Sequence, residues 1–302
     1  LGLTQEVAND QLQEYLHIEY AGDDELLVPI SQVNKLSKFI GMAGEHPKLS
    51  SLGKTSWDTE QKKAKRSVVI LAKELIEHYA RREMSKAPIV SDQDSDAYLE
   101  FAKNFPYEET TDQLKAINEV SADMETSVPM NRLLIGDVGF GKTEVMMRAS
   151  FKMAEAGHQV AVLCPTTVLA AQHLAVFTER FKDTKYTVAG LSRFFTSKEN
   201  RNSVDQINIG EVDIVVGTHR LLSKDVKFKS LGLLIVDEEQ RFGVKQKETI
   251  KQVNYGVHHL SVSATPIPRT LGMALSNIQE ISIINKPPVG RKSIHTELVK
   301  DD

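Results

Sequence analysis

The first 52 residues alternate apolar and polar side chains in the way that β-strands do. Leu16, Ile18 and Tyr20 fall on one side of such a strand, because successive side chains point to opposite faces. Residues 21–24 read Ala-Gly-Asp-Asp, which is typical of a turn, and an apolar run at 26–28 follows. We therefore predict a β-hairpin that belongs to a partial small β domain over residues 1–52.

The spacing of apolar residues changes in the next segment, residues 53–90. Here Ala64, Val68, Leu71, Leu75 and Tyr79 recur at intervals of three and four, with charged residues between them. This spacing predicts one long helix that connects two domains. A coiled-coil dimer is the alternative, and the short, irregular apolar stripe argues against it.

From residue 91 to 286 short apolar runs alternate with amphipathic stretches. Such alternation indicates an α/β fold, a parallel sheet with helices on both faces, and ligands bind at the carboxyl ends of its strands. The expected strands are Leu133–Ile135, Val160–Leu163, Thr187–Leu191, Ile214–Gly217, Leu233–Val236 and Leu260–Ser263.

Composition narrows the class of protein without identifying it. The 302 residues are 41% hydrophobic and 26% charged, with a formal net charge of −4, as in soluble globular proteins. Cys164 is the only cysteine, which rules out an internal disulfide and a cysteine-based zinc cluster. The histidines show no metal-ligand spacing, so we predict no structural metal. No apolar run reaches the length of a membrane span, and we expect a cytoplasmic protein.

The most specific motif is the run from Gly136 to Thr143, which fits the phosphate-binding pattern G-x-x-x-x-G-K-[ST]. An apolar strand precedes it and a helical stretch follows, which is the context such a loop needs and an ordinary glycine-rich turn lacks. Gly136, Gly139 and Gly141 let backbone N–H groups face an anion, and the helix N-terminus adds partial positive charge. Lys142 would reach the β and γ phosphates, and the Thr143 hydroxyl would bind Mg²⁺.

A second motif, Asp237-Glu238-Glu239-Gln240, directly follows an apolar strand. Asp237 is suited to holding Mg²⁺, and Glu238 to orienting and deprotonating the water that attacks the γ-phosphate. A surface acidic cluster is the alternative, and the phosphate loop upstream makes it the weaker one.

Upstream of the phosphate loop, Gln113 could donate to and accept from the edge of adenine, and Phe105 could stack on the base. Taken alone, Thr111-Asp112-Gln113 indicates no more than a helix start capped by Thr111 or Asp112. Hydroxyl and basic residues at two other strand ends, Thr166 and Thr218 to Arg220 with His219 between them, could follow a phosphodiester backbone, although each loop taken singly is better explained by ordinary loop chemistry. The hydroxyls of Ser263 and Thr265 could bridge the γ-phosphate region and the nucleic-acid face.

The order of these motifs resembles the first RecA-like lobe of superfamily 2 helicases and translocases. The sequence Ser263-Ala264-Thr265-Pro266 and its continuation narrow the resemblance to RecG and the transcription-repair coupling factors. Flanking runs that include Ser192-Arg193-Phe194, Gln240 to Val244 and Tyr15 to Tyr20 are similar to the coupling-factor family, whose polymerase-interacting domain is Tudor-like. A RecG-like helicase, which would have a DNA-wedge domain before its motor, is the alternative.

The resemblance implies an ATP- and Mg²⁺-dependent translocase on double-stranded DNA that displaces stalled RNA polymerase and recruits nucleotide-excision repair proteins. It implies adenine contacts by Phe105 and Gln113, Mg²⁺ binding by Thr143 and Asp237, and catalysis by Lys142, Asp237 and Glu238. It also implies a polymerase contact, the N-terminal region of the β subunit, for residues 1–52. DNA-side and coupling candidates by resemblance are Thr166, Arg193, Thr218, His219, Arg220, Ser263, Thr265 and Arg269.

The resemblance further implies that residues 287–302 begin a linker to a second lobe. Since the first residue is Leu and the last is Asp302, we expect an excised fragment. The second lobe of the family supplies arginines to the γ-phosphate, so we expect the fragment to bind nucleotide and hydrolyse little. A passive polymerase-binding module is the competing interpretation.

Overall fold

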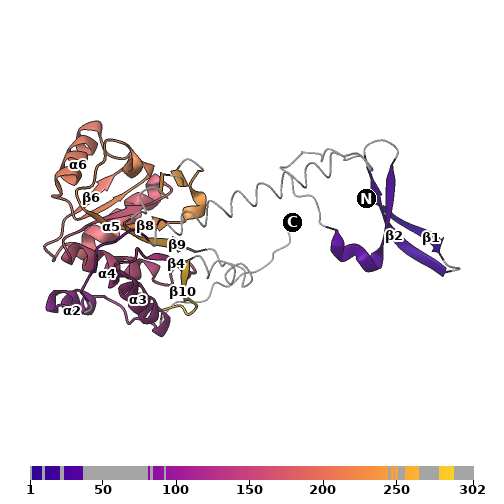
Figure 1. Cartoon of the computed structure of the whole chain (residues 1–302), viewed down its shortest axis with the longest axis horizontal. Helices are drawn as coiled ribbons and strands as arrows, with labels where there is room; N and C mark the ends of the chain where they lie inside the picture. The colour runs from indigo at the N-terminus through magenta and orange to yellow at the C-terminus, as the bar shows by residue number, and fades with distance from the viewer. Residues whose placement is uncertain are drawn as a thin grey trace, which may run out of the picture. The chain divides into compact units, whose positions relative to one another are not determined.

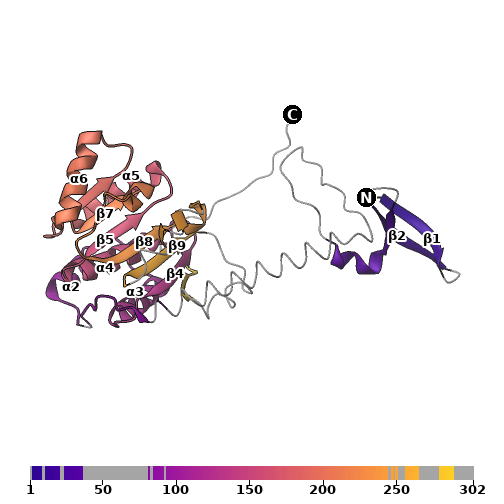
Figure 2. The ribbon, with the colours of Figure 1, turned by 45° about the horizontal axis from the view of Figure 1, so that its top comes forward.

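The computed structural model describes residues 2–8, 11–20, 24–36, 81, 84–91, 93–243, 246–247, 249–250, 256–264 and 279–288. The chain divides into two compact units, Leu1–Glu74 and Leu75–Asp302 (Figures 1 and 2). This division falls inside the predicted connecting helix, most of which lies outside the described residues. The domain boundaries at 52, 90 and 286 therefore stay predictions.

The first unit contains an antiparallel sheet in the order β1-β2-β3. Its strands are β1 (Gly2–Ala8), β2 (Gln11–Glu19) and β3 (Glu25–Pro29), and a short 3-10 helix, η1 (Ile30–Lys35), follows. The predicted hairpin is confirmed as β2 and β3, with Glu19 opposite Glu25 and Tyr15 opposite Pro29. The backbone N–H of Tyr20 donates to the Asp24 carbonyl at 2.9 Å and closes the turn.

The second unit is built on a seven-stranded sheet in which every pair is parallel. Its order is β10-β4-β9-β8-β5-β7-β6, so strands that follow each other in the chain are often not neighbours. The strands are β4 (Asn131–Gly136), β5 (Gln159–Leu163), β6 (Val188–Leu191), β7 (Ile214–Gly217), β8 (Leu231–Asp237), β9 (His258–Ser263) and β10 (Glu280–Ile284).

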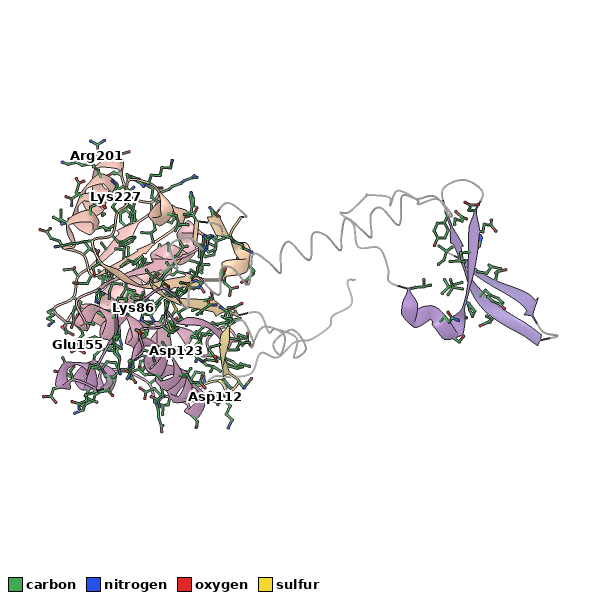
Figure 3. All side chains as sticks on the ribbon, viewed as in Figure 1. Lys86, Asp112, Asp123, Glu155, Arg201 and Lys227 are labelled. Carbon is green, nitrogen blue, oxygen red and sulfur yellow. The ribbon has the colours of Figure 1, made fainter. Side chains whose placement is uncertain are left out.

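Six of these strands confirm the sequence prediction, and β10 was not predicted. The central strands are continuous apolar runs because both of their faces are covered. β10 is an edge strand in which Ser282 and Ile284 are buried while Ile283 is half exposed, so its sequence has no such run. It is held in place by Asp112, whose Oδ2 accepts from the N–H groups of Asn285 and Lys286 at 2.9 and 3.1 Å (Figure 3).

Helices cover both faces of this sheet, as predicted. They are α2 (Asp96–Lys103), α3 (Thr111–Met124), α4 (Lys142–Glu155), α5 (Thr167–Phe181) and α6 (Ser197–Ile209), with short 3-10 turns η2 (His219–Leu222) and η3 (Glu239–Arg241). Figure 1 shows α2, α3 and α4 grouped beside β4, and α6 beside β6. Within the described part of the chain, no helix has the length and apolar character to span a bilayer.

Two apolar clusters form the core, one on each face of the sheet. Along β5, Val160 and Val162 belong to the cluster under α2 to α5, whereas Ala161 and Leu163 belong to the cluster under α6. This alternation is the period of two that a strand imposes. The larger cluster includes aromatic rings contributed by three helices, namely Phe101, Phe151, Phe177 and Phe181.

The start of α3 corrects one detail of the sequence analysis. The N-cap is Thr110, whose hydroxyl accepts from the Gln113 N–H at 3.2 Å, rather than Thr111 or Asp112. The Gln113 side chain accepts in return from the Thr110 N–H at 2.8 Å, which completes a capping box. Three hydroxyl or carboxyl residues in a row each satisfy the preference for an N-cap, so only the backbone geometry distinguishes them.

Candidate nucleotide site at the carboxyl edge of the sheet

The strand order gathers the predicted site residues along one edge and separates them into two groups. The phosphate loop, Ser263 and Asp237 follow β4, β9 and β8, which are neighbours in the sheet. We call this group the nucleotide half. Thr166, Thr218 and Arg193 follow β5, β7 and β6, which we call the outer half.

The phosphate loop has the backbone that its glycines permit. Gly139 and Gly141 have φ values of +80° and +81°, in the left-handed region that other residues rarely adopt. A Cβ on Gly141 would lie 2.1 Å from Gln113 Nε2, so the position also has no room for a side chain. Gly141 is the N-cap of α4 and provides no side-chain cap, which leaves the helix N-terminus open toward an anion.

Lys142 is folded back over this loop. Its ammonium donates to the carbonyls of Gly136 and Asp137, the latter at 3.0 Å. Burial lowers the pKa of Lys142, and the negative charges of Asp237, Glu238 and Asp137 oppose that shift. A flexible cation held only by backbone carbonyls can exchange them for phosphate oxygens, which make stronger, charge-assisted bonds.

Two carboxylates follow β8 and have different surroundings. Asp237 is 8% exposed, and its Oδ2 lies 3.1 Å from Nε2 of His173 on α5. Glu238 has a φ of +49°, the only positive value at a non-glycine position in the described residues. Its Oε1 accepts from the Ala264 N–H at 2.8 Å, and the Gln240 amide donates to its Oε2. Strained backbone of this kind is concentrated at functional sites.

The end of β9 is thereby joined to the end of β8. Besides the contact between Glu238 and Ala264, Gln240 Nε2 lies 3.4 Å from Ser263 Oγ, and Ser261 Oγ donates to Glu239 at 2.6 Å. These bonds provide a physical connection between Ser263 and the carboxylates, which its predicted coupling role requires. Thr265 and Arg269, the other two coupling candidates, lie outside the described residues.

Gln113, one of the two predicted adenine contacts, already has its side-chain amide hydrogen-bonded within the protein. It is 2% exposed, its Nε2 donates to the Phe140 carbonyl at 2.8 Å, and its Oε1 serves the capping box. Phe105 is half buried and meets Tyr107 edge to face, with ring centroids 5.6 Å apart. The adenine contacts of Phe105 and Gln113 stay predictions, and Tyr107 is an aromatic candidate that the sequence analysis missed.

These residues line a cavity of about 1420 Å³ that extends from the phosphate loop to α5. Phe105, Tyr107, Gln113, Gly141 and Thr143 line the part nearest the loop. The aromatic rings of Phe105 and Tyr107 suit the base of a nucleotide, and the backbone N–H groups at Gly141 suit its phosphates. The residues at the phosphate-loop end of the cavity therefore fit the predicted ligand. Among the described residues, no group of three or more His, Cys, Asp or Glu side chains could hold a metal ion.

A buried ionic cluster, also missed from the sequence, supports the wall of this cavity. Glu144 is 3% exposed and accepts from Arg148 Nε at 2.6 Å and from Arg180 Nη2 at 3.0 Å. Arg148 also pairs with Glu109, and Arg180 donates to the Phe101 carbonyl at 2.7 Å. The spacing of Glu144 and Arg148, four residues apart on a helix, is a weak sequence signal for an ion pair. Arg180 is 36 positions from Glu144, and no sequence pattern indicated their contact.

In the outer half, two of the candidate side chains make local contacts. The Thr166 hydroxyl accepts from the Leu169 N–H at 3.2 Å and caps α5, and Arg220 forms a bidentate pair with Asp225. Thr218 is only 2% exposed, whereas Arg193 and His219 are exposed to solvent. The DNA contacts of all five residues stay predictions, and exposure favours Arg193 and His219.

Comparisons with known sequences agree with this geometry. Residues 110–274 match the DEAD/DEAH box helicase family, and residues 1–40 match the CarD-like/TRCF RID domain. The chain is 48% identical over 300 residues to the transcription-repair-coupling factor of Bacillus subtilis (strain 168), which covers 99% of this chain and 25% of that protein. It is 45% identical over 302 residues to the same factor of Staphylococcus epidermidis (strain ATCC 12228 / FDA PCI 1200), covering 100% and 26%. The chain thus spans about a quarter of the length of these relatives.

Solved structures share the same fold. RecG bound to a three-way DNA junction aligns with a TM-score of 0.60 and 34% identity, over 73% of this chain and 31% of that chain. The DEAD-box helicase Mss116, bound to ssRNA and UDP-BeF, aligns with a TM-score of 0.51 and 16% identity, over 63% of this chain and 43% of that chain. The second likeness concerns the fold alone.

Proposed function

The chain belongs to the DEAD/DEAH box helicase family, and from that premise we propose that it is the ATP-binding first lobe of a double-stranded DNA translocase. One observation carries the proposal. The phosphate loop, Asp237 and Ser263 come from three neighbouring strands, and the Glu238 carboxylate is hydrogen-bonded to the backbone after Ser263. This arrangement supports the proposal, because phosphoryl transfer uses a phosphate loop, a metal-binding carboxylate and a residue that orients the attacking water.

In this proposal each polar group has one task. Lys142 leaves the loop carbonyls and binds the β and γ phosphates, while Thr143 and Asp237 hold Mg²⁺. The metal, when bound, neutralises charge on the phosphates. Glu238 orients the attacking water and accepts its proton, and its bond to the Ala264 N–H keeps one carboxylate oxygen in a set position.

We further propose that this lobe alone turns over ATP slowly. An arginine delivered to the γ-phosphate is worth roughly 10³–10⁵ in rate in related phosphoryl transfer. The relatives are about four times as long as this chain, and we assign that arginine to their additional sequence.

For the first unit we propose binding to RNA polymerase, through the N-terminal region of its β subunit. The support is the match of residues 1–40 to the CarD-like/TRCF RID domain. Leu26, Ile30 and Val33, in and after β3, are about two-fifths exposed, and exposed apolar side chains of this kind are suited to contact with a protein partner. Displacement of stalled polymerase and recruitment of excision-repair proteins would follow in the longer protein.

A RecG-like helicase is the second candidate, because the motor lobe is 34% identical to RecG. The match of residues 1–40 to a domain named for the coupling factors favours the first candidate. Separation of the strands of a three-way DNA junction would favour the second, since the proposed translocase moves on duplex without unwinding it.

The test compares this chain with a version extended to the length of the relatives. We expect both to bind a fluorescent ATP analogue in the presence of Mg²⁺, and only the longer one to hydrolyse ATP faster when duplex DNA is added. If the shorter chain hydrolysed ATP rapidly and Lys142→Ala abolished that activity, the proposal that this lobe alone turns over ATP slowly would be contradicted. Binding of the polymerase β-subunit N-terminal region to both versions tests the role of the first unit.

A further inference from the structure

Helix α5 contacts the nucleotide half through a side chain that has no role in the function proposed above. His173 Nε2 lies 3.1 Å from Asp237 Oδ2, and the two side chains are only 14% and 11% exposed. An ionised carboxylate only accepts hydrogen bonds, so Nε2 carries the proton and donates it to Oδ2. Within the described residues Asp237 Oδ1 accepts no hydrogen bond, and it is the oxygen left for a metal ion or its water.

The same helix is attached to the site a second time. Arg180 Nη2 donates to Glu144 Oε1 at 3.0 Å, and Glu144 directly follows Thr143 of the phosphate loop. His173 and Arg180 are two helical turns apart and therefore lie on one face of α5. The first residue of this helix follows Thr166, the N-cap in the outer half of the edge. One rigid element thus contacts Asp237, contacts the phosphate-loop helix and begins among the candidate DNA contacts.

We propose that His173 is a positioning residue for the Asp237 carboxylate, which it holds with Oδ2 engaged and Oδ1 presented to Mg²⁺. This inference rests on the proposed function of Asp237 as a metal ligand. Side chains that hydrogen-bond to a metal ligand set its orientation, and their loss commonly costs about 10–100-fold in metal affinity. A histidine that only filled space beside β8 would have no such effect.

The experiment measures the Mg²⁺ concentration that gives half-maximal binding of a fluorescent ATP analogue by the full chain. We expect His173→Ala to raise this concentration about 10–100-fold. We expect His173→Gln to stay close to the wild-type value, because its amide nitrogen can reach the position of Nε2. Binding of the analogue in EDTA should be the same in all three proteins. Gln172→Ala, an exposed neighbour on α5, is the control for changes in the helix itself.

A double-mutant cycle separates positioning from general damage to the site. Once Asp237→Asn has removed the metal-binding carboxylate, adding His173→Ala should change the Mg²⁺ dependence no further. Additive losses in the double variant would overturn the proposal, because they would show that the two side chains act independently.

An unchanged Mg²⁺ dependence in His173→Ala would also overturn it. If His173→Ala lowers the melting temperature in EDTA too far to be used, His173→Asn, whose shorter amide falls short of Asp237, replaces it in the comparison with His173→Gln. Absence of Mg²⁺-dependent binding in the wild-type chain would contradict the proposed function itself, which distinguishes that failure from a failure of this inference.

Discussion

Candidate side chains in the two halves of the carboxyl edge make hydrogen bonds of very different range. In the nucleotide half, Gln113 bonds to a carbonyl 27 residues away, and Glu238 to an N–H 26 residues away. In the outer half, Thr166 bonds to a residue three positions on, and Arg220 to one five positions on. These side chains of the nucleotide half are therefore fixed by contacts between distant segments, whereas Thr166 and Arg220 are fixed within their own loops. The backbone of the outer half is also joined across strands, by bonds from the Cys164 N–H to Gly217 and from the Thr218 N–H to Leu191.

This difference has a consequence for ligand binding. Groups connected across strands are preorganised, and a phosphate has only to replace the carbonyls that hold Lys142. A partly exposed ion pair such as Arg220 with Asp225 contributes about 0–1 kcal/mol, so an incoming phosphate would displace it at small cost. Under the proposed function, the outer half would bind a ligand that slides past, and the nucleotide half a ligand held in one geometry.

The largest effect should come from breaking the cluster that joins α4 to α5. Glu144→Ala leaves Arg148 and Arg180 without their shared buried partner, and we expect it to lower the free energy of unfolding by about 3–5 kcal/mol. Urea denaturation measures the change. Glu179→Ala, which removes from α5 the exposed partner of Lys182, should leave the free energy of unfolding almost unchanged. Equal losses in the two variants would contradict the role of the cluster.

A pair of glycine substitutions separates backbone strain from damage to the nucleotide half. Gly141→Ala and Gly157→Ala both force a side chain into a φ above +80°, and each should cost about 1–3 kcal/mol of unfolding free energy. A Cβ at Gly157 meets nothing within 4 Å, whereas one at Gly141 collides with Gln113. We expect only Gly141→Ala to abolish binding of the ATP analogue in a fluorescence titration. Equal binding by both variants would be the contrary result.

Lys142→Ala tests the ammonium on its own. Its charge-assisted bonds to phosphate are worth about 1.5–3 kcal/mol, so nucleotide affinity should fall about 10–100-fold while stability changes little. Titration calorimetry with an ATP analogue gives the affinity. The matched control is Lys115→Ala, whose side chain is 74% exposed on α3 and should leave affinity unchanged. An affinity loss shared by both variants would indicate a general effect of net charge.

The smallest expected effect concerns the outer half. Arg193→Ala should remove one phosphate contact and reduce the slope of log K against log salt for duplex DNA by about 0.9. Arg201→Ala, an exposed arginine on α6, is the control and should leave the slope unchanged (Figure 3). Fluorescence anisotropy at several salt concentrations measures the slope. A change of the slope in Arg201→Ala alone would indicate that DNA contacts α6 rather than the strand ends.

Local sequence patterns were sufficient to predict much of the secondary structure of this protein. Six of the seven strands of the parallel sheet, the β2–β3 hairpin and the phosphate loop with its glycines were predicted, because a buried strand, a turn and an anion-binding loop each impose a residue pattern within a few positions. The edge strand β10 was not, since its half-exposed sequence resembles many loops.

The assembly of the site depended on tertiary structure. No local pattern indicates that β9 and β8 insert between β4 and β5, although this order brings Asp237 and Ser263 beside the phosphate loop. Likewise, the contacts of His173 with Asp237 and of Arg180 with Glu144 join residues 64 and 36 positions apart. The sequence by itself identified the candidate groups for binding and cleaving a nucleotide. Only the packing of α5 against the sheet decided which other side chains hold those groups, because such contacts arise from the shapes of surfaces distant along the chain.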